Sequence, residues 1–330
     1  MSVAEPEAGA NGVMVRPELV GVCGSDIHFF SGHLGAASEA HALYPRIQGH
    51  EFAGKVEAVG PGAAGRAEVG ARVAVWPLWS CGHCYPCRIG RRSVCDNFRL
   101  IGIHENGALA ELVRVPADQV FPIGDLPAAL GAFVEPMAVA VHGVARSALR
   151  PGEQVVVLGG GPIGQAVGLA AKARGGCVLL AEPLLPRRQI AEALGAEVTV
   201  DPSGEDVAAR VSEWTAGEGA AVVIDATGSP GCIALSVELV ASAGRVVVVG
   251  ISDRSVELPI GPFTAKEFDM IGSSCHERED FEEAIRLVGA SSELLAPRLG
   301  PEFDLDEARA ALDFSRSHPA ETMKVLVRVG

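Results

Sequence analysis

The sequence predicts an α/β protein with two domains, one mostly β and the other a doubly wound parallel sheet. The 330 residues match the length of about two typical domains. Roughly the first 130 residues hold short β-like runs separated by glycine and proline, which is typical of irregular antiparallel structure. From about Pro151 onward, continuous apolar strands alternate with helical patterns, which indicates βαβ units around a buried parallel sheet.

The expected elements follow the chain in that order. The first region should contain strands at residues 55–59, 72–75 and 110–115. The second should contain strands at 154–158, 177–182, 197–200, 221–225 and 245–250, with helices at 163–174, 187–194, 206–214 and 232–241. A later helix at 279–288 and a final strand at 324–329 suit a return to the first domain. The predicted domains are therefore residues 1–138 with 267–330, and residues 139–266.

Composition and charge exclude several classes of protein. With 48% hydrophobic and 21% charged residues, the chain can bury large cores and is not a disordered segment. Its net charge of −14 disfavours binding to nucleic acid or to anionic membranes. No basic leader followed by an apolar block marks the N-terminus, and the apolar stretches are broken by glycine and proline. We therefore expect a cytoplasmic protein with no membrane or nucleic-acid partner.

A glycine-rich loop lies between the first strand and the first helix of the second region. Its sequence, GGGPIG, is the pattern of a turn that lets backbone approach a dinucleotide while the helix N-terminus receives the pyrophosphate. A purely structural strand-to-helix turn is the alternative. The expected cofactor contacts are Gly159, Gly161, Pro162, Ile163 and Gly164.

An acidic residue follows at the end of the next strand. Glu182 is placed to bind both hydroxyls of an adenine ribose, and its charge would repel a 2′-phosphate. The sequence therefore favours NAD over NADP as the cofactor. Arg187 and Arg188, one helical turn further on, are close enough to accommodate a phosphate, although a solvated start of a helix explains them as well.

Four of the eight cysteines lie close together in the first region. Cys81, Cys84, Cys87 and Cys95 offer four thiolates, enough to close a tetrahedral zinc shell with no open position. A closed shell is structural because no substrate can reach the metal. Disulfide formation and iron–sulfur chemistry are the alternatives.

A second group of metal-binding residue types is spread along the chain. Cys23, His50, Glu51 and Glu135 are each ordinary when taken alone. Together a thiolate, an imidazole and two carboxylates provide the mixed ligand set of a catalytic zinc with room for water or substrate.

Six ordered motifs, CGSDIH, GHEF, CGHCYPC, VEPMAVAVH, GGGPIG and ETMKVLV, resemble the zinc-dependent medium-chain dehydrogenase/reductase superfamily from about Val13 to the C-terminus. The resemblance is to its polyol branch, which contains sorbitol, butanediol, threonine and sugar-acid dehydrogenases. The stretches YPRIQGHEF, SCGHCYPCRIGRRSVC and LIGIHENG are most similar to the gulonate- or galactonate-type enzymes. The resemblance implies a GroES-like catalytic domain, a Rossmann NAD-binding domain, and NAD-linked oxidation of a secondary hydroxyl of a polyol, sugar acid or vicinal diol.

The resemblance also assigns roles around the catalytic zinc. Cys23, His50 and Glu51 would be ligands, and Glu135 would be a fourth ligand or the partner of a zinc-bound water. Asp26 would orient the imidazole of His50. The remaining implied roles are proton transfer from the substrate hydroxyl for Ser25, a further proton-transfer step for His28, and cofactor contact for Arg187, Thr227, Gly250 and Ser273.

The family further implies two zinc ions per chain, one catalytic and one structural, and assembly as a homotetramer or homodimer. Family members usually have a further strand pair ahead of the segment that matches residues 13–20; either the start of this sequence was placed too far downstream, or the protein dispenses with that pair. A second departure is Trp76, which stands where an acidic residue is usual. We expect Trp76 to pack beneath the cysteines. Phe29 and Phe30 either shape the substrate pocket or at least one of them belongs to the core, and His104 either reaches the pocket or lies on a surface loop. The alternative functions are a catalytically degenerate binding protein, favoured only by the short N-terminus, and a zinc-free quinone reductase, disfavoured by the cysteines and the GHE motif.

Overall fold

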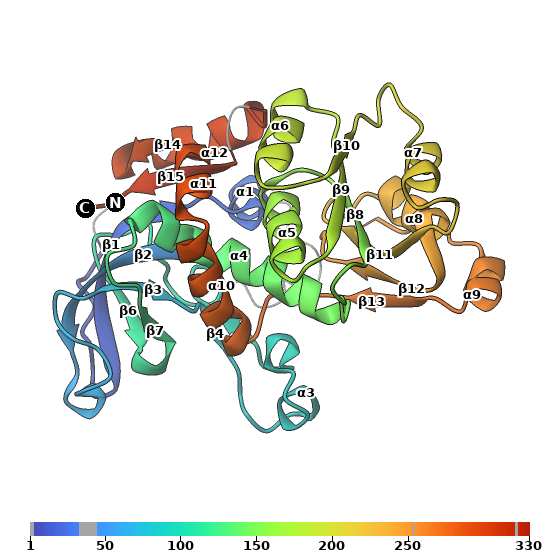
Figure 1. Ribbon diagram of the computed structural model, residues 1–330. Helices are drawn as coiled ribbons and strands as arrows, with labels where there is room; N and C mark the ends of the chain where they lie inside the picture. The colour runs from blue at the N-terminus through green and yellow to red at the C-terminus, as the bar shows by residue number, and fades with distance from the viewer. Residues whose placement is uncertain (1–2, 33–44, 253, 321–322) are drawn as a thin grey trace. The chain divides into compact units, whose positions relative to one another are not determined.

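The computed structural model describes residues 3–32, 45–252, 254–320 and 323–330 (Figure 1). Tyr44, Glu321 and Thr322, which belong to the motifs above, lie outside these ranges. The chain divides into two compact units. The first unit comprises Met1–Glu135 with Glu277–Gly330, and the second comprises Pro136–His276. Both units mix strands with helices, so the predicted α/β class is confirmed.

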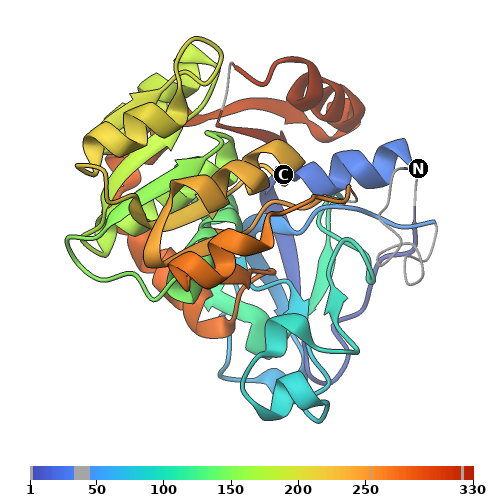
Figure 2. The ribbon, with the colours of Figure 1, turned by 90° about the vertical axis from the view of Figure 1, so that its right-hand side faces the viewer.

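The first unit is built on a mostly antiparallel sheet with a parallel pair of strands at one edge. Its elements are β1 (Gly12–Gly21), α1 (Gly24–Ser31), β2 (Glu51–Val59), η1 (Pro61–Ala63), β3 (Arg72–Val75), β4 (Leu78–Trp79), α3 (Tyr85–Arg88), η2 (Arg92–Val94), β5 (Arg99–Leu100), β6 (Val113–Pro116), η3 (Ala117–Gln119), β7 (Val120–Pro122), α10 (Arg278–Ala290), α11 (Ser292–Leu295), η4 (Ala296–Arg298), β14 (Leu299–Asp304), η5 (Leu305–Glu307), α12 (Ala308–Ser317) and β15 (Lys324–Arg328). The segment with α3 and η2, drawn in cyan in Figure 2, carries the four clustered cysteines.

Seven strands form the main sheet of the first unit, in the order β14-β15-β1-β2-β3-β7 with β6 also paired to β1. Alternating apolar residues cover one face, because successive side chains in a strand point to opposite sides. Val13, Phe52 and Val73 are among the buried residues of this core. The C-terminal strand β15 pairs with β1, so the two ends of the chain meet in one sheet.

The second unit contains a parallel sheet of six strands in the order β10-β9-β8-β11-β12-β13. Its elements are β8 (Gln154–Leu158), α5 (Pro162–Ala173), β9 (Cys177–Ala181), α6 (Leu185–Ala193), β10 (Val198–Val200), α7 (Val207–Trp214), β11 (Ala220–Asp225), α8 (Pro230–Leu239), β12 (Val240–Val248), α9 (Ile260–Lys266) and β13 (Asp269–Gly272). Helices α5 and α6 pack on β8, β9 and β10, while α8 packs on β11 and β12 (Figure 1). The strand order doubles back at β8, which makes this a doubly wound sheet.

Two boundaries in the second unit differ most from the sequence expectation. Strand β12 begins at Val240 rather than at residue 245, because residues 241–244 loop out of the β11–β12 register and Ala243 has a φ of 56°. The unit also continues beyond residue 266 to His276, because β13 pairs with β12 and extends the sheet.

Helix α4 (Ala128–Arg146) contains the division between the units at Glu135 and Pro136. It is the one helix of the described residues that is long and apolar enough to cross a membrane by length and composition. In the structure 78% of that apolar stretch is buried against protein. Its composition is therefore that of a core helix.

Candidate active site and cysteine lobe

Strand pairing in the first unit brings Cys23, His50 and Glu51 together. Glu51 begins β2 and pairs with Gly21 of β1, two residues before Cys23. One ligand atom from each of the three side chains lies within 4.8 Å of the others. Gly21 has no room for a side chain, since a Cβ there would lie 2.3 Å from Oε2 of Glu51. The close packing of β1 on Glu51 thus depends on a glycine.

Asp26 contacts both the cysteine and the histidine of this group. Its Oδ2 accepts the backbone N–H of Cys23 at 3.0 Å, which holds Cys23 as the N-terminal cap of α1. Its Oδ1 lies 3.9 Å from Nδ1 of His50. At 3.9 Å the second contact is an approach of charges rather than a hydrogen bond, and it places a carboxylate beside the imidazole nitrogen that an orienting residue would face.

The buried polar atoms of the group test whether a metal fits there. His50 and Glu51 are 4% and 1% exposed. His50 Nδ1, Asp26 Oδ1 and Ser25 Oγ are buried, and none has a hydrogen-bond partner among the described residues. Buried polar atoms are seldom left without partners, and a thiol, an imidazole and a carboxylate form a donor set that zinc prefers. The residues present therefore fit a zinc ion.

Negative charge dominates the electrostatics around His50. Burial lowers the pKa of the imidazole, but the charges of Cys23, Asp26 and Glu135 outweigh burial and leave its pKa well above the ordinary value. A cation is therefore favoured in this group, whether it is a proton or a metal ion.

Lys324 is a buried cation beside Cys23, His50 and Glu51. In the sequence it stood out only as part of the ETMKVLV motif. It is 4% exposed, and its Nζ lies 2.8 Å from Oε1 and 2.6 Å from Oε2 of Glu51. Nζ also donates to the carbonyl of Val22 at 3.1 Å. Burial lowers the pKa of Lys324, but the charges of Glu51, Cys23 and Glu135 and the hydrogen bond to Glu51 together outweigh burial and leave its pKa raised. A lysine that begins an otherwise apolar strand was the available signal.

Glu135 lies outside the compact group of three. It is 7% exposed on α4, and its charge reaches His50, Glu51 and Lys324. Helix α4 packs closely on β2 one turn earlier, because a Cβ on Gly131 would lie 2.6 Å from Cβ of Ala53. Glu135 therefore lies near Cys23, His50 and Glu51, but it is not one of the side chains whose ligand atoms lie within 4.8 Å of one another.

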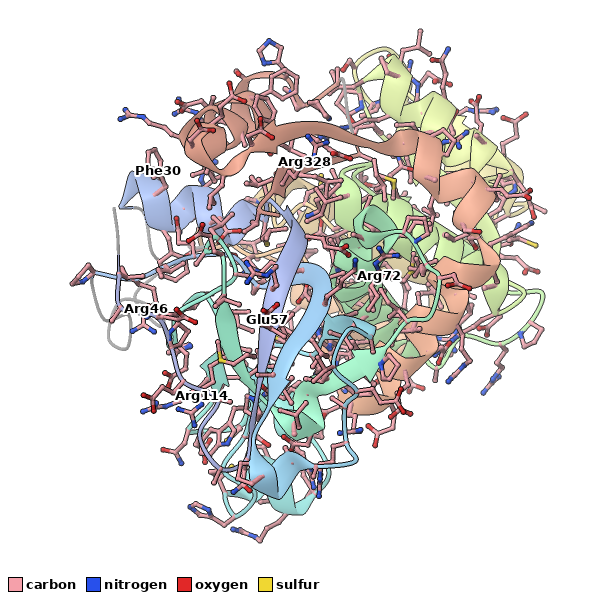
Figure 3. The ribbon with its side chains drawn as sticks, turned by 90° about the vertical axis from the view of Figure 1, so that its left-hand side faces the viewer. Phe30, Arg46, Glu57, Arg72, Arg114 and Arg328 are labelled. Atoms are coloured by element: carbon pink, nitrogen blue, oxygen red, sulfur yellow. The ribbon has the colours of Figure 1, made fainter. Side chains whose placement is uncertain are left out.

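The residues expected to move a proton lie on α1. Ser25 is half-buried and His28 is exposed, three residues further along the same helix, where side chains share a face. Phe29 is buried, whereas Phe30 is 48% exposed and lies 5.7 Å from the guanidinium of Arg309 on α12 (Figure 3).

Two other residues singled out from the sequence have structural surroundings. Trp76 is 7% exposed, as expected for a packing residue, although its indole N–H has no partner among the described residues. His104 Nδ1 accepts the N–H of Leu100 at 3.0 Å, and its ring meets Phe98 edge-on at 5.6 Å. His104 therefore stabilises the loop at residues 98–104 through these two contacts.

The four clustered cysteines form a compact lobe, defined here as residues 81–95. All four sulfurs lie within 4.8 Å of one another, and the distances from Cys95 Sγ are 3.5 Å to Cys81 and 3.7 Å to Cys84. A tetrahedral zinc with Zn–S bonds of about 2.3 Å needs sulfurs roughly 3.8 Å apart. None of the cysteines is in a disulfide. The lobe therefore fits a zinc ion held by four sulfurs.

The pKa values of the cysteine thiols in the lobe differ, because their backbone hydrogen bonds and their burial differ. The N–H of His83 lowers the pKa of Cys81 to about 5, whereas burial raises the pKa of Cys95 to about 12. The N–H groups of Cys81 and Asn97 both lie 3.3 Å from Cys95 Sγ. Four adjacent thiols cannot all ionise without a compensating cation.

The glycine loop of the second unit has the close approaches predicted for it. Gly159 has a φ of +95°, and a Cβ there would lie 2.5 Å from Cγ2 of Thr227. A Cβ on Gly164 would lie 1.8 Å from the carbonyl oxygen of Gly159. Helix α5 begins at Pro162 and Ile163 after Gly161, with no side-chain cap among the described residues. Its first N–H groups are therefore available to an anion.

Glu182 is held against this loop. It is 4% exposed, its Oε2 accepts the N–H of Gly160 at 2.7 Å, and its Oε1 accepts the N–H of Leu184 at 3.0 Å. Arg187 Nη1 lies 3.8 Å from the same Oε2. The position corresponds to the end of β9, where Rossmann folds hold the ribose.

The two arginines differ from the expected solvated start of a helix. Their side chains are only 19% and 13% exposed. Arg188 donates to the carbonyls of Glu182 and Pro183 and pairs with Asp201 at 3.2 Å. Arg188 is thus occupied in structure, while Arg187 faces the glycine loop.

The other predicted cofactor contacts lie at the same carboxyl edge of the parallel sheet. Thr227 follows β11 and donates its hydroxyl to Asp225 at 2.6 Å. Gly250 follows β12, and a Cβ there would lie 1.9 Å from the nitrogen of Gly228. Ser273 follows β13, and its N–H donates to Val248 at 2.9 Å. Ligands of doubly wound sheets bind along this edge.

Comparison with known proteins identifies both units. Residues 9–125 match the family model of the alcohol dehydrogenase GroES-like domain, and residues 162–290 match that of the zinc-binding dehydrogenases. The chain is 36% identical to the 2-dehydro-3-deoxy-L-galactonate 5-dehydrogenase of Pseudoalteromonas atlantica, over 93% of this chain and 89% of the relative.

Two solved structures are also similar. A zinc-binding dehydrogenase of Sinorhizobium meliloti 1021, bound to NADP, has a TM-score of 0.91 and 33% identity, covering 99% of this chain and 94% of that one. RspB of Escherichia coli CFT073, in complex with NADH, has a TM-score of 0.87 and 30% identity, covering 98% and 94%. The resemblance drawn from the sequence motifs is confirmed. The chain is an oxidoreductase that belongs to the zinc-binding alcohol dehydrogenase family.

Proposed function

We propose that the protein is a zinc-dependent, NAD-linked dehydrogenase that reversibly oxidises a secondary hydroxyl of a polyol, sugar acid or vicinal diol to a ketone. The observation that carries this proposal is the buried convergence of Cys23, His50 and Glu51, with unpartnered polar atoms around it. A sugar acid is the favoured substrate class, because a relative that is 36% identical is named as a galactonate-type dehydrogenase.

The geometry supports the following assignment of catalytic residues. Cys23, His50 and Glu51 would hold the catalytic zinc, and Glu135 would bind the metal or its water. When bound, zinc lowers the pKa of a coordinated hydroxyl toward neutrality. Ser25 would accept the substrate's hydroxyl proton at Oγ, which has no partner among the described residues, while its own hydroxyl proton passes to His28. The exposed His28 would then release a proton to solvent.

Neighbouring charges support this set of ligands. Asp26 would orient His50, because its Oδ1 lies 3.9 Å from Nδ1 of the imidazole. Lys324 holds both oxygens of Glu51, which offsets the negative charge of the ligand group before a substrate arrives.

NAD is the proposed cofactor. It would lie on Gly159, Gly161, Pro162, Ile163 and Gly164, with Thr227, Gly250 and Ser273 along the same edge. Glu182 carries the preference for NAD, since its carboxylate is fixed where a ribose 2′-hydroxyl binds and would repel a 2′-phosphate. Arg187 lies beside that carboxylate and limits the preference for NAD, because its positive charge would attract a 2′-phosphate. The similar solved structures include one with NADP and one with NADH.

The cysteine lobe would hold the second, structural zinc, so that each chain binds two zinc ions. Free cysteines suit a reducing compartment, which supports a cytoplasmic location. We also propose a homotetramer or homodimer, which light scattering coupled to size-exclusion chromatography would test.

The proposed reaction is tested by following NADH formation with a panel of sugar acids, polyols, vicinal diols and threonine. We expect turnover on at least one sugar acid, loss of turnover on chelation, and a lower rate with NADP. No turnover on the whole panel by protein that contains two zinc ions would contradict the proposed substrate classes. No turnover by protein that contains one zinc ion would instead support a degenerate active site.

A further inference from the structure

A buried glutamine connects the glycine loop to the helix that follows the next strand. Gln165 is 1% exposed on α5. Its Nε2 donates to the carbonyl of Gly160 at 3.0 Å and to the carbonyl of Arg187 at 2.7 Å. Both neighbours are acceptors only, so the nitrogen of the amide must face them. One side chain thus joins two segments that are distant in sequence.

These two bonds complete a closed set of contacts around Glu182. The N–H of Gly160 donates to Glu182, while the carbonyl of Gly160 accepts from Gln165. The peptide groups on both sides of Gly160 are therefore fixed. Arg187, whose carbonyl is held by Gln165, extends its guanidinium to within 3.8 Å of the Glu182 carboxylate. A displacement of Gln165 would therefore change the positions of both the Glu182 carboxylate and the Arg187 guanidinium.

Packing alone does not explain a glutamine at this position. The buried neighbours of Gln165 on α5 include Ala166, Val167 and Leu169, which are apolar. The Oε1 of Gln165 is itself buried with no hydrogen-bond partner among the described residues. Burying an unpaired amide oxygen is unfavourable, so an apolar residue would serve packing better. The two bonds to Gly160 and Arg187 are what the glutamine adds.

We propose that Gln165 is a positioning residue that sets the preference of the enzyme for NAD(H) over NADP(H). It acts through Gly160 and Arg187, which it holds so that Glu182 presents its carboxylate to the adenine ribose. This inference rests on the dinucleotide site proposed above. Without Gln165, Gly160 can turn away, Glu182 loses a fixed partner, and both the grip on the 2′-hydroxyl and the exclusion of a 2′-phosphate weaken.

The test measures dissociation constants of NADH and NADPH by fluorescence titration of the zinc-loaded protein. Gln165→Leu should weaken NADH binding about tenfold, because two carbonyls lose their donor. NADPH binding should change less than about threefold, so the ratio of the two constants should move toward NADPH. Val167→Ala is the matched control, since Val167 is 0% exposed on the same helix and makes none of these bonds. It should lower the melting temperature without changing the ratio.

Two further variants keep the outcomes distinct. Gln165→Glu preserves the shape of the side chain but can donate at most one hydrogen bond, so it should shift the ratio in the same direction even if the leucine variant does not fold. Glu182→Ala tests the proposed site itself. An unchanged ratio in the Gln165 variants, with a shift in Glu182→Ala, would overturn the inference and leave the site standing. No change in NADH binding for Glu182→Ala would refute the site.

Discussion

The two groups of metal-binding side chains in the first unit differ in how the chain assembles them. The lobe draws four identical ligands from residues 81–95, and its sulfurs are separated by distances that suit a closed tetrahedral shell. The second group, Cys23, His50 and Glu51, is the one proposed to be catalytic and is called the catalytic group below. It gathers unlike ligands from the start of α1 and the start of β2, with Lys324 added from β15. A closed set of thiolates stabilises a fold, whereas a mixed set beside a buried cation leaves charge and space for chemistry.

Removing an imidazole ligand should have the largest effect and should affect only the catalytic group. We expect His50→Ala to lower turnover by about a thousandfold or more, because the metal loses a ligand and the substrate hydroxyl loses its activation. Steady-state kinetics on the best substrate checks this. NADH affinity should stay within about twofold of the native value, since the residues expected to bind the cofactor belong to the second unit. Unchanged turnover would show that the group is not catalytic.

Lys324→Met should reveal what the buried cation does when metal is absent. Removing one partner of a buried ion pair costs about 3–5 kcal/mol, and Glu51 is 1% exposed. We expect the metal-free protein to lose stability by about this amount and the zinc-loaded protein to lose less, because zinc also compensates Glu51. Denaturant titrations with and without zinc measure both differences. Equal losses in the two forms would mean that Lys324 and the metal act independently.

Cys95→Ser should affect the cysteine lobe and leave the catalytic group intact. The sulfur of Cys95 lies within 3.7 Å of two other cysteine sulfurs and receives two backbone N–H groups. We expect a loss of about 3 kcal/mol in the free energy of unfolding, since structural zinc contributes directly to folding. The catalytic zinc and the Michaelis constant should be retained at low temperature. Loss of both metals would show that the two sites are not separate.

Asp26→Asn should have a smaller effect on the metal. The variant keeps an acceptor for the N–H of Cys23 but removes the charge that faces His50. We expect zinc affinity at the catalytic group to fall about 10–100-fold. Competition with a chromophoric chelator measures it, and the affinity of the lobe serves as an internal control.

The smallest effect is expected at a partly exposed ion pair in the first unit. Arg72, labelled in Figure 3, donates to Glu18 at 2.7 Å, and this bond lowers the pKa of Glu18 below its usual 4.5. The pair therefore stabilises the fold above that value, and its contribution disappears as the pH falls through the lower pKa of the folded state. Glu18→Gln should cost less than about 1 kcal/mol at pH 7 and nothing at strongly acid pH, by denaturant titration. A loss as large as that of Lys324→Met would contradict the distinction between surface and buried pairs.

The difference between the two groups also explains what the sequence predicts well. Short-range patterns were sufficient for the lobe and for the glycine loop, because residues 81–95 and 159–164 each lie on one local segment. The α/β class followed from the alternation of apolar strands and helices for the same reason. In contrast, Lys324 meets Glu51 only through the pairing of β15 with β1 and of β1 with β2. No local pattern contains that pairing.

The contacts of Gln165 and Arg188 could not be predicted from the sequence for a related reason. A glutamine in an apolar helix and an arginine at a helix start are ambiguous until their partners are known. The carbonyls of Gly160 and Arg187, which Gln165 holds, belong to the glycine loop and to the first turn of α6, which are distant in sequence. The excursion at residues 241–244 was likewise hidden, because Ala243 takes a positive φ that alanine rarely adopts.

The central claim is that the chain contains two separable zinc sites, one for structure and one for catalysis. Metal analysis of the purified native protein, His50→Ala and Cys95→Ser tests it most directly. About two zinc ions are expected per native chain and about one in each variant, with turnover lost when the site of His50 is empty and retained at low temperature when the lobe is empty. One zinc ion in the native protein, or two in His50→Ala, would contradict it.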